Sequence, residues 1–167
     1  GLVSDARERL RAVLAETGHE AKKSLGQNFL ISDAVISRIL DEAATLFARY
    51  GYDGASLGML AEAVGVTKAA IYHYFPNKRD IYEAVIVRML RELSEHVAAA
   101  IAGQEDARLA LRAFMLAHAE YFEANFDGFA TMLVGFGGMK NRNLLAEAQT
   151  LRADYEASLR TIIVRGI

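Results

Sequence analysis

The segment TKAAIYHYF, residues 67–75, gathers side chains whose types and spacing suit contact with a nucleic acid. Thr67 offers a hydroxyl group and Lys68 places a cation beside it, a pair that suits a phosphate. The small side chain of Ala69 would let the protein backbone come close to the edges of bases. This combination indicates a surface that binds DNA through its phosphates and its major groove.

Tyr72 and His73 follow in the same segment and carry polar groups at the ends of flat, rigid rings. An aromatic residue in a helix belongs more often to the core than to a binding surface. Here Ile71 and Phe75 already fill the inward-facing positions, which assigns Tyr72 and His73 to the outward face. A metal-binding role for His73 is not expected, because the other histidines show no ligand spacing.

Two short helices are required to position these side chains. The sequence predicts one over residues 57–64 and one over residues 68–74, and Gly65 in the turn between them allows a sharp change of direction. Ser56 and Thr67 stand where N-cap residues are expected. Because helix N-termini carry free N–H groups and partial positive charge, both starts are candidate phosphate sites. The pattern is that of a helix-turn-helix, whose second helix enters the major groove.

A longer helix is predicted after the proline turn. Asn77 is placed to cap it, and Asp80 lies in its first turn, where the helix dipole favours negative charge. The helix is expected to run to about Ile101. Lys78 stands at its start, where the flanking DNA backbone would pass, and is a further candidate phosphate contact.

The rest of the chain also has the periodicity of helices, and no segment alternates as a strand would. In a helix starting near Ser32 or Asp33, an apolar stripe comprises Ile36, Ile39, Leu40, Ala43, Ala44 and Phe47. Further helices are expected over residues 5–17, 107–125 and 127–136, and from about 143 onward to the end of the chain. Residues 19–30 are expected to form a loop. The fold class is therefore all-α, with a three-helix helix-turn-helix domain followed by a helical bundle.

The composition limits the remaining chemistry. The 167 residues are 53% hydrophobic with a formal net charge of −2, so a nucleic acid would have to be bound by a local basic surface. The absence of cysteine excludes disulfides, thiolate metal sites and cysteine nucleophiles. No apolar run approaches the roughly 20 residues of a membrane helix, and nothing resembles a signal peptide. We expect a cytoplasmic protein that binds no membrane, needs no metal or cofactor, and is not an enzyme.

The segment KKSLGQNFL, residues 22–30, supports a competing interpretation. Residues 7–40 resemble the start of the ribosomal RNA adenine dimethyltransferases, in which the Gly-Gln-Asn-Phe-Leu segment lies against S-adenosylmethionine. That resemblance implies a parallel sheet with a glycine loop and an acidic residue for the ribose, and no such pattern follows Leu40. The lone glycine cluster VGFGG, residues 134–138, is weak support. We therefore expect a composite chain, in which a methyltransferase-like fragment precedes a different body.

Residues 36–90, and above all the cluster IYHYFPNK before the long helix, resemble the DNA-binding domain of the TetR family of bacterial transcriptional repressors. The resemblance implies that DNA is contacted by Ser56, Thr67, Lys68, Ala69, Tyr72, His73 and Lys78. The sequence departs from the family at Gly58 and Met59. A charged or polar pair is usual there, and its first member often contacts DNA.

The same resemblance implies a helical body that binds a small effector and forms a homodimer. Large apolar and aromatic residues gather in this region, and the candidate pocket comprises Phe114, His118, Tyr121, Phe122, Phe129, Met132 and Phe136. His118 is the expected polar group of the pocket, and the lining suits an apolar or aromatic molecule. The two further C-terminal helices through which the family usually dimerises are not expected in this chain.

These observations predict three parts: an extension over residues 1–35, a helix-turn-helix domain over 36–80, and a ligand-binding and dimerising domain over 81–167. The predicted function is that of a ligand-responsive regulator, a repressor that binds a palindromic double-stranded DNA operator as a homodimer. One alternative is an S-adenosylmethionine-dependent ribosomal RNA adenine methyltransferase fragment without a complete catalytic domain. The other is a helical fragment that no longer binds anything.

Overall fold

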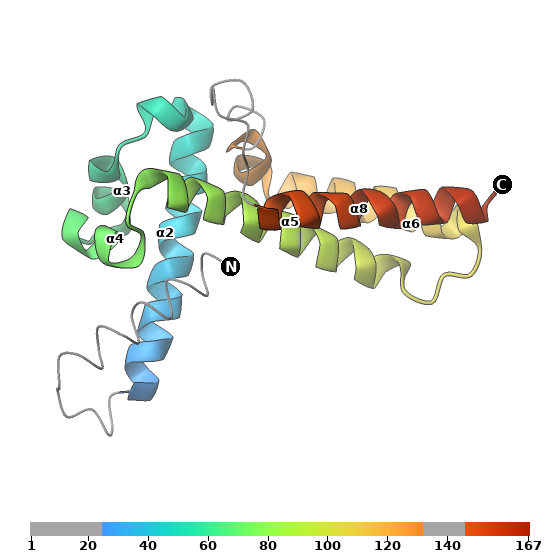
Figure 1. Ribbon diagram of the computed structural model, residues 1–167, viewed down its shortest axis with the longest axis horizontal. Helices are drawn as coiled ribbons and strands as arrows, with labels where there is room; N and C mark the ends of the chain where they lie inside the picture. Colours follow the sequence, from blue (N-terminus) through green and yellow to red (C-terminus); the bar gives the residue numbers. More distant parts are fainter. Residues whose placement is uncertain (1–24, 132–145) are drawn as a thin grey trace. The chain divides into compact units, whose positions relative to one another are not determined.

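The computed structural model describes residues 25–131 and 146–167 of the chain. The helices in these ranges are α2 (Leu25–Gly54), α3 (Leu57–Val64), α4 (Lys68–Tyr74), α5 (Lys78–Ile101), α6 (Ala107–Ala124) and α8 (Ala146–Arg165) (Figure 1). Residues 126–131 are also helical. No strand occurs in the described ranges. The predicted all-α class is therefore confirmed, and the described residues contain no parallel sheet on which a methyltransferase cleft could be built.

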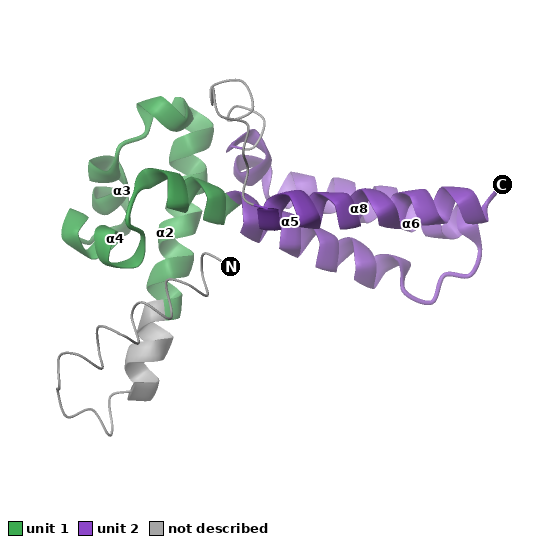
Figure 2. Cartoon of the chain, in the orientation of Figure 1, with its two compact units in different colours: residues 1–85 green, residues 86–167 purple. Residues whose placement is uncertain are grey.

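The chain divides into two compact units, residues 1–85 and residues 86–167 (Figure 2). The division falls inside α5, after Val85, so this one helix contributes to both units. The functional division at residue 80 stays a prediction.

Helix α2 begins earlier than the sequence indicated. It starts at Leu25, so residues 25–30 are helical and their prediction as a loop is wrong. The glycine and the polar residues of this stretch indicate a loop when they are considered alone. A glycine costs a helix only about 1 kcal/mol, however, and extending a formed helix is easier than starting one. Near the other end, Gly51 has φ 70° and ψ 172°, a non-helical conformation that interrupts the helix before Gly54.

The core of unit 1 is built on the apolar stripe of α2. The predicted stripe residues are all buried, with at most 8% of each exposed: Ile36, Ile39, Leu40, Ala43, Ala44 and Phe47. Helix α2 packs against α3, and α3 packs against α4. Burying each large apolar side chain contributes about 1.5–3 kcal/mol relative to leaving it in water. This packing fixes the two short helices, which could not persist alone.

Three aromatic rings join the end of α2 to the start of α5. Ring centroids are 5.9 Å apart for Phe47 and Tyr52, 5.4 Å for Phe47 and Tyr82, and 5.3 Å for Tyr52 and Tyr82. Burial raises the pKa of Tyr82 to about 12, so its phenol stays neutral at ordinary pH. The cluster lies entirely in unit 1.

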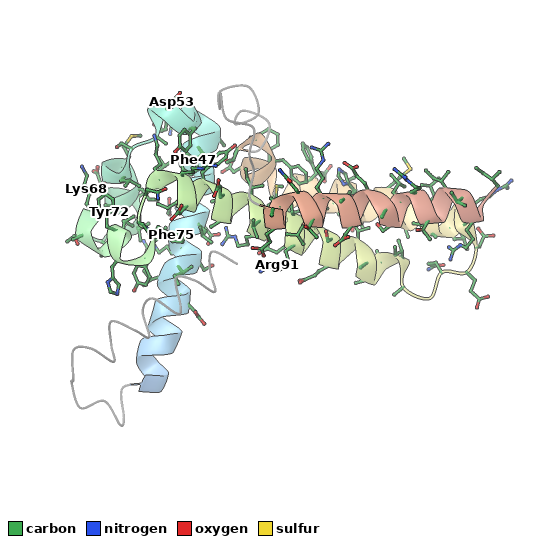
Figure 3. All side chains as sticks on the ribbon, in the orientation of Figure 1. Phe47, Asp53, Lys68, Tyr72, Phe75 and Arg91 are labelled. Atoms are coloured by element: carbon green, nitrogen blue, oxygen red, sulfur yellow. The ribbon has the colours of Figure 1, made fainter. Side chains whose placement is uncertain are left out.

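In unit 2, α6 packs against α8, and a side chain near each end of α8 makes a polar contact with another part of the unit. Arg91 of α5, which is labelled in Figure 3, forms an ion pair with Glu147 of α8. The guanidinium of Arg165 donates to the Gln104 carbonyl at 3.0 Å. Helix α8 ends at Arg165, whereas the sequence predicted a helix that continues to the last residue.

Several sequence predictions fall partly or wholly outside the described residues. They are the helix over residues 5–17, the end of the helix over 127–136, and the start of the last helix near 143. Among the described helices, none has the length and apolar character needed to cross a membrane.

Candidate nucleic-acid interface

Helix α3 begins at a capped, solvent-exposed end. The Ser56 hydroxyl accepts a hydrogen bond from the Met59 N–H at 3.1 Å, and Ser56 has the extended backbone of an N-cap. Leu60 in the middle of the helix and Val64 at its end are buried, with 3% and 4% of each exposed. This burial anchors α3 in the core, while Ser56 at its start remains exposed.

The turn between α3 and α4 depends on Gly65. Its backbone is left-handed, with φ 77° and ψ 35°, a conformation that glycine adopts at no steric cost. Its N–H donates to the carbonyls of Ala61 at 3.0 Å and Glu62 at 3.1 Å, and the Val66 N–H donates to Ala61 at 2.9 Å. These bonds satisfy the carbonyl groups left free at the end of α3. The predicted glycine turn is confirmed.

Helix α4 is short and is held by its two ends and one face. The Thr67 hydroxyl accepts from the Ala70 N–H at 3.1 Å, which confirms the predicted cap. Ile71 and Phe75 are 0% and 1% exposed, which confirms the predicted inward pair. The Phe75 N–H donates to the Ile71 carbonyl at 2.9 Å and closes the helix.

The opposite side of α4 is open to solvent. We define the α4 face as the exposed residues Thr67, Lys68, Ala69, Tyr72 and His73. Tyr72 is 52% exposed although it is a large aromatic residue, and it lies with Lys68 on this helix (Figure 3). The structure thus brings five of the predicted DNA-contacting residues together on one surface. Ser56 lies at the start of the neighbouring helix.

Lys78 differs from this group because its ammonium is bonded within the protein. It donates to the carbonyl of Tyr52 at 2.6 Å and to that of Ala55 at 3.1 Å. The nitrogen also lies 4.5 Å from the centroid of the Tyr52 ring. Two of the three ammonium donors therefore tie the start of α5 to the end of α2. Sequence reasoning missed this role, because nothing local links Lys78 to carbonyls more than twenty residues earlier.

Helix α5 starts as predicted. The Asn77 side-chain oxygen accepts from the Asp80 N–H at 3.0 Å. Next to this cap, Arg79 Nε lies 2.8 Å from Glu83 Oε1. This ion pair compensates the cost of burying the Glu83 carboxylate, since Glu83 is only 6% exposed. The hydrogen bond to Glu83 is the main reason that the pKa of Arg79 lies above its usual value.

In unit 2 the structure brings together five of the predicted pocket residues. We define the aromatic cluster as Phe114, His118, Tyr121, Phe122 and Phe129. Its centre is Phe129, whose ring centroid lies 4.8 Å from Phe122, 5.9 Å from His118 and 6.1 Å from Tyr121. The other two predicted members, Met132 and Phe136, lie outside the described residues.

Two polar side chains that sequence reasoning did not select complete the cluster. The Tyr155 hydroxyl and His118 Nδ1 form a 2.6 Å hydrogen bond, and the Tyr121 hydroxyl donates to Glu92 at 2.8 Å. Burial raises the pKa of Tyr155 to about 12. Burial, followed by the bond to Glu92, also raises the pKa of Tyr121. Tyr155 and Glu92 come from other helices, so no spacing in the sequence pointed to them.

In the described part of the chain, no three histidine or acidic side chains lie where they could jointly hold a metal ion. What the described residues do provide is a pair of capped helices at a fixed glycine turn, the second with a polar outer face. These features define a helix-turn-helix protein, the class that inserts its second helix into the major groove.

Comparisons with known proteins agree with this class. Residues 39–85 match the family described as bacterial regulatory proteins, tetR family. The chain is 46% identical over 46 residues to the biofilm operon negative transcriptional regulator IcaR of Staphylococcus aureus, an alignment covering 28% of this chain and 25% of IcaR. The corresponding Staphylococcus epidermidis protein is 42% identical over 45 residues, covering 27% of this chain and 24% of the relative. The alignments thus span about a quarter of these relatives.

Solved structures extend the similarity over both units. The crystal structure of the TetR family transcriptional regulator PfmR from Thermus thermophilus is similar with a TM-score of 0.69 and 39% identity, covering 78% of this chain and 69% of PfmR. Mycobacterium smegmatis AmtR gives a TM-score of 0.63 and 27% identity, covering 77% of this chain and 61% of AmtR. The chain belongs to the TetR family of transcriptional regulators. Neither the described fold nor these similarities support the methyltransferase alternative.

Proposed function

We propose that this chain is a ligand-responsive transcriptional regulator that represses by binding a palindromic operator as a homodimer. The observation that carries the proposal is the α4 face, an exposed polar surface on a helix whose other side is buried. The similarity to IcaR, which is named as a negative regulator, favours repression. Such a regulator would act in the cytoplasm, on chromosomal DNA.

Binding in a DNA groove requires some side chains that contact phosphates and others that contact bases, and the α4 face offers both kinds. Phosphate contacts position a protein on DNA, whereas contacts to base edges select the sequence. Lys68 and Lys78 are the proposed phosphate contacts, and the third donor of Lys78 remains for this purpose. Thr67, Ala69 and His73 are proposed to face the bases.

The test is selection of bound duplexes from a random pool, followed by gel shifts on the selected sequence. We expect a palindromic consensus whose half-sites are about 34–36 Å apart, one turn of DNA. Lys68→Ala should weaken binding to all sequences alike and lower the salt slope by roughly one unit. Failure to enrich any sequence, or saturable binding of S-adenosylmethionine in calorimetry, would count against the proposal.

Dimerisation is supported by apolar side chains that unit 2 leaves exposed. Leu116 on α6 is 49% exposed, and Ile163 and Val164 on α8 are 47% and 66% exposed. A second copy could cover such residues, because large exposed apolar groups gather at interfaces. Sedimentation of the protein with its selected duplex should give two copies per palindrome. One copy per duplex would contradict the homodimer.

The aromatic cluster is the proposed effector site. Its rings and the His118–Tyr155 hydrogen bond offer an apolar lining with one polar pair, a combination that suits an aromatic or apolar molecule. A thermal-shift screen of such molecules should identify compounds that both stabilise the protein and release the selected duplex. Phe129→Ala should abolish both effects of an identified compound. A compound that stabilises the Phe129→Ala variant as strongly as the wild-type protein would bind outside the aromatic cluster.

A further inference from the structure

Gly58, in the first turn of α3, lies directly beside the end of the Lys68 side chain. A Cβ placed on Gly58 would be 3.0 Å from Cε and 3.3 Å from Nζ of Lys68. The same point is 3.6 Å from the Ser56 hydroxyl oxygen. We call this space, bounded by Lys68 and Ser56, the Gly58 gap. Lys68 thus reaches from α4 across to α3 and occupies the room that a side chain at position 58 would take.

The end of the Lys68 side chain lies where position 58 carries no side chain. The first turns of α3 and α4 contain no acidic residue. In the described part of the chain, the ammonium has no hydrogen-bond acceptor or ionic partner. An exposed lysine without a partner normally samples many rotamers. The absence of a side chain at Gly58 leaves room for it there, and the Ser56 hydroxyl oxygen borders the same space.

We propose that Gly58 is a positioning residue for DNA binding: by leaving the gap open, it places the Lys68 ammonium beside Ser56 as a joint site for one backbone phosphate. This inference rests on the proposed function and specifies how one of its contacts is made. Lysine suits the role because its ammonium is a compact point charge on a flexible stem, able to meet a phosphate without strict geometry. The Ser56 hydroxyl adds a neutral donor to the same oxygen atoms.

The geometry predicts how a larger residue at position 58 would act. The atoms that it would meet belong to the far end of a flexible side chain, so the helices need not move. Filling the gap should therefore displace the ammonium and leave the fold intact. The effect on DNA should then depend entirely on whether Lys68 is present.

The experiment is a double-mutant cycle with Gly58→Leu and Lys68→Met, measured on the selected operator and on a scrambled duplex of the same length. Gly58→Leu should weaken binding to both duplexes by a similar factor, about tenfold, and reduce the salt slope by about 0.9. In the Lys68→Met background, Gly58→Leu should change affinity less than about twofold. Arg112→Ala on α6 is the matched control for loss of one exposed charge, and it should leave binding unchanged.

Three results would overturn the inference. Equal weakening by Gly58→Leu in both backgrounds would mean that the new side chain obstructs DNA directly. An unchanged affinity and salt slope would mean that the gap has no role, and loss restricted to the operator would indicate a base contact instead of a phosphate contact. If Gly58→Leu melts at a lower temperature, Gly58→Ala provides the same cycle with a smaller group. A wild-type protein that binds neither duplex would instead refute the proposed function itself.

Discussion

Lys78, which is a proposed phosphate contact, is also bonded within the protein. Its ammonium bridges two carbonyls at the end of α2 and lies over the Tyr52 ring, so it stabilises the frame that carries the α4 face. Lys78→Met should lower the free energy of unfolding by roughly 1–3 kcal/mol, because hydrogen bonds to a charged group are lost and carbonyls are left without a donor. Urea denaturation measures this change.

Lys68→Met is the matched control, since Lys68 has the same side chain on the exposed α4 face. It should weaken DNA binding without changing the unfolding midpoint. If Lys78→Met also leaves the midpoint unchanged, the carbonyl bonds contribute nothing to stability, and Lys78 acts on DNA alone.

The exposure of Tyr72 leads to a second prediction at this scale. With 52% of its surface open, its ring contributes little to the core, and its hydroxyl is free to position a phosphate. Tyr72→Phe should therefore reduce affinity for every duplex without changing the order of preference or the melting temperature. Gel shifts on the selected sequence and its single-base variants provide the measurement. A changed order of preference would assign the hydroxyl to a base.

At the scale of elements, the decisive feature is the turn that fixes α4 on α3. Gly65 has a left-handed backbone, and among the described residues no atom beyond its chain neighbours lies within 4 Å of where its Cβ would be. Gly65→Ala should therefore cost only the backbone strain of a left-handed residue, about 1–2 kcal/mol. Chemical denaturation would detect the loss.

Gly65→Asn is the control, because asparagine tolerates the left-handed region better than alanine. It should lose clearly less stability than Gly65→Ala. Equal losses for the two variants would show that something other than backbone conformation makes the position sensitive.

At the scale of the whole molecule, tyrosine phenols whose pKa values are raised by burial contribute to the response to high pH in both units. Burial raises the pKa of Tyr82 in unit 1 and of Tyr155 in unit 2 from 10.0 to about 12. Between these values the folded state holds protons that the unfolded state has released. Their contribution to stability is therefore complete below about pH 10 and is lost as the pH rises towards 12.

Denaturation curves from pH 8 upward should show a steady loss of unfolding free energy above pH 10. Tyr82→Phe and Tyr155→Phe should each make that loss less steep, because phenylalanine does not titrate. A slope identical to that of the wild-type protein in both variants would mean that these phenols titrate alike in the folded and unfolded states.

Local sequence was enough to predict the helices that carry the α4 face. Ser56, Gly65 and Thr67 act through their own backbone and through neighbours within a few residues, so cap and turn chemistry could be recognised locally. The buried stripe of α2 was equally legible, because a helix repeats every 3.6 residues whatever it packs against. The same local reasoning failed at residues 25–30, where the glycine and polar residues were outweighed by continuation of a long helix.

Which distant side chains contact one another could be seen only in the three-dimensional structure. Lys78 on the carbonyls of α2, Tyr155 on His118 and Lys68 in the Gly58 gap each join residues from different helices. Such contacts depend on how helices pack and which rotamers the packing leaves open, and no periodicity or cap encodes them. The sequence therefore indicated which residues could contact DNA, whereas packing determined that the Lys78 ammonium is bonded within the protein and that Lys68 stays exposed.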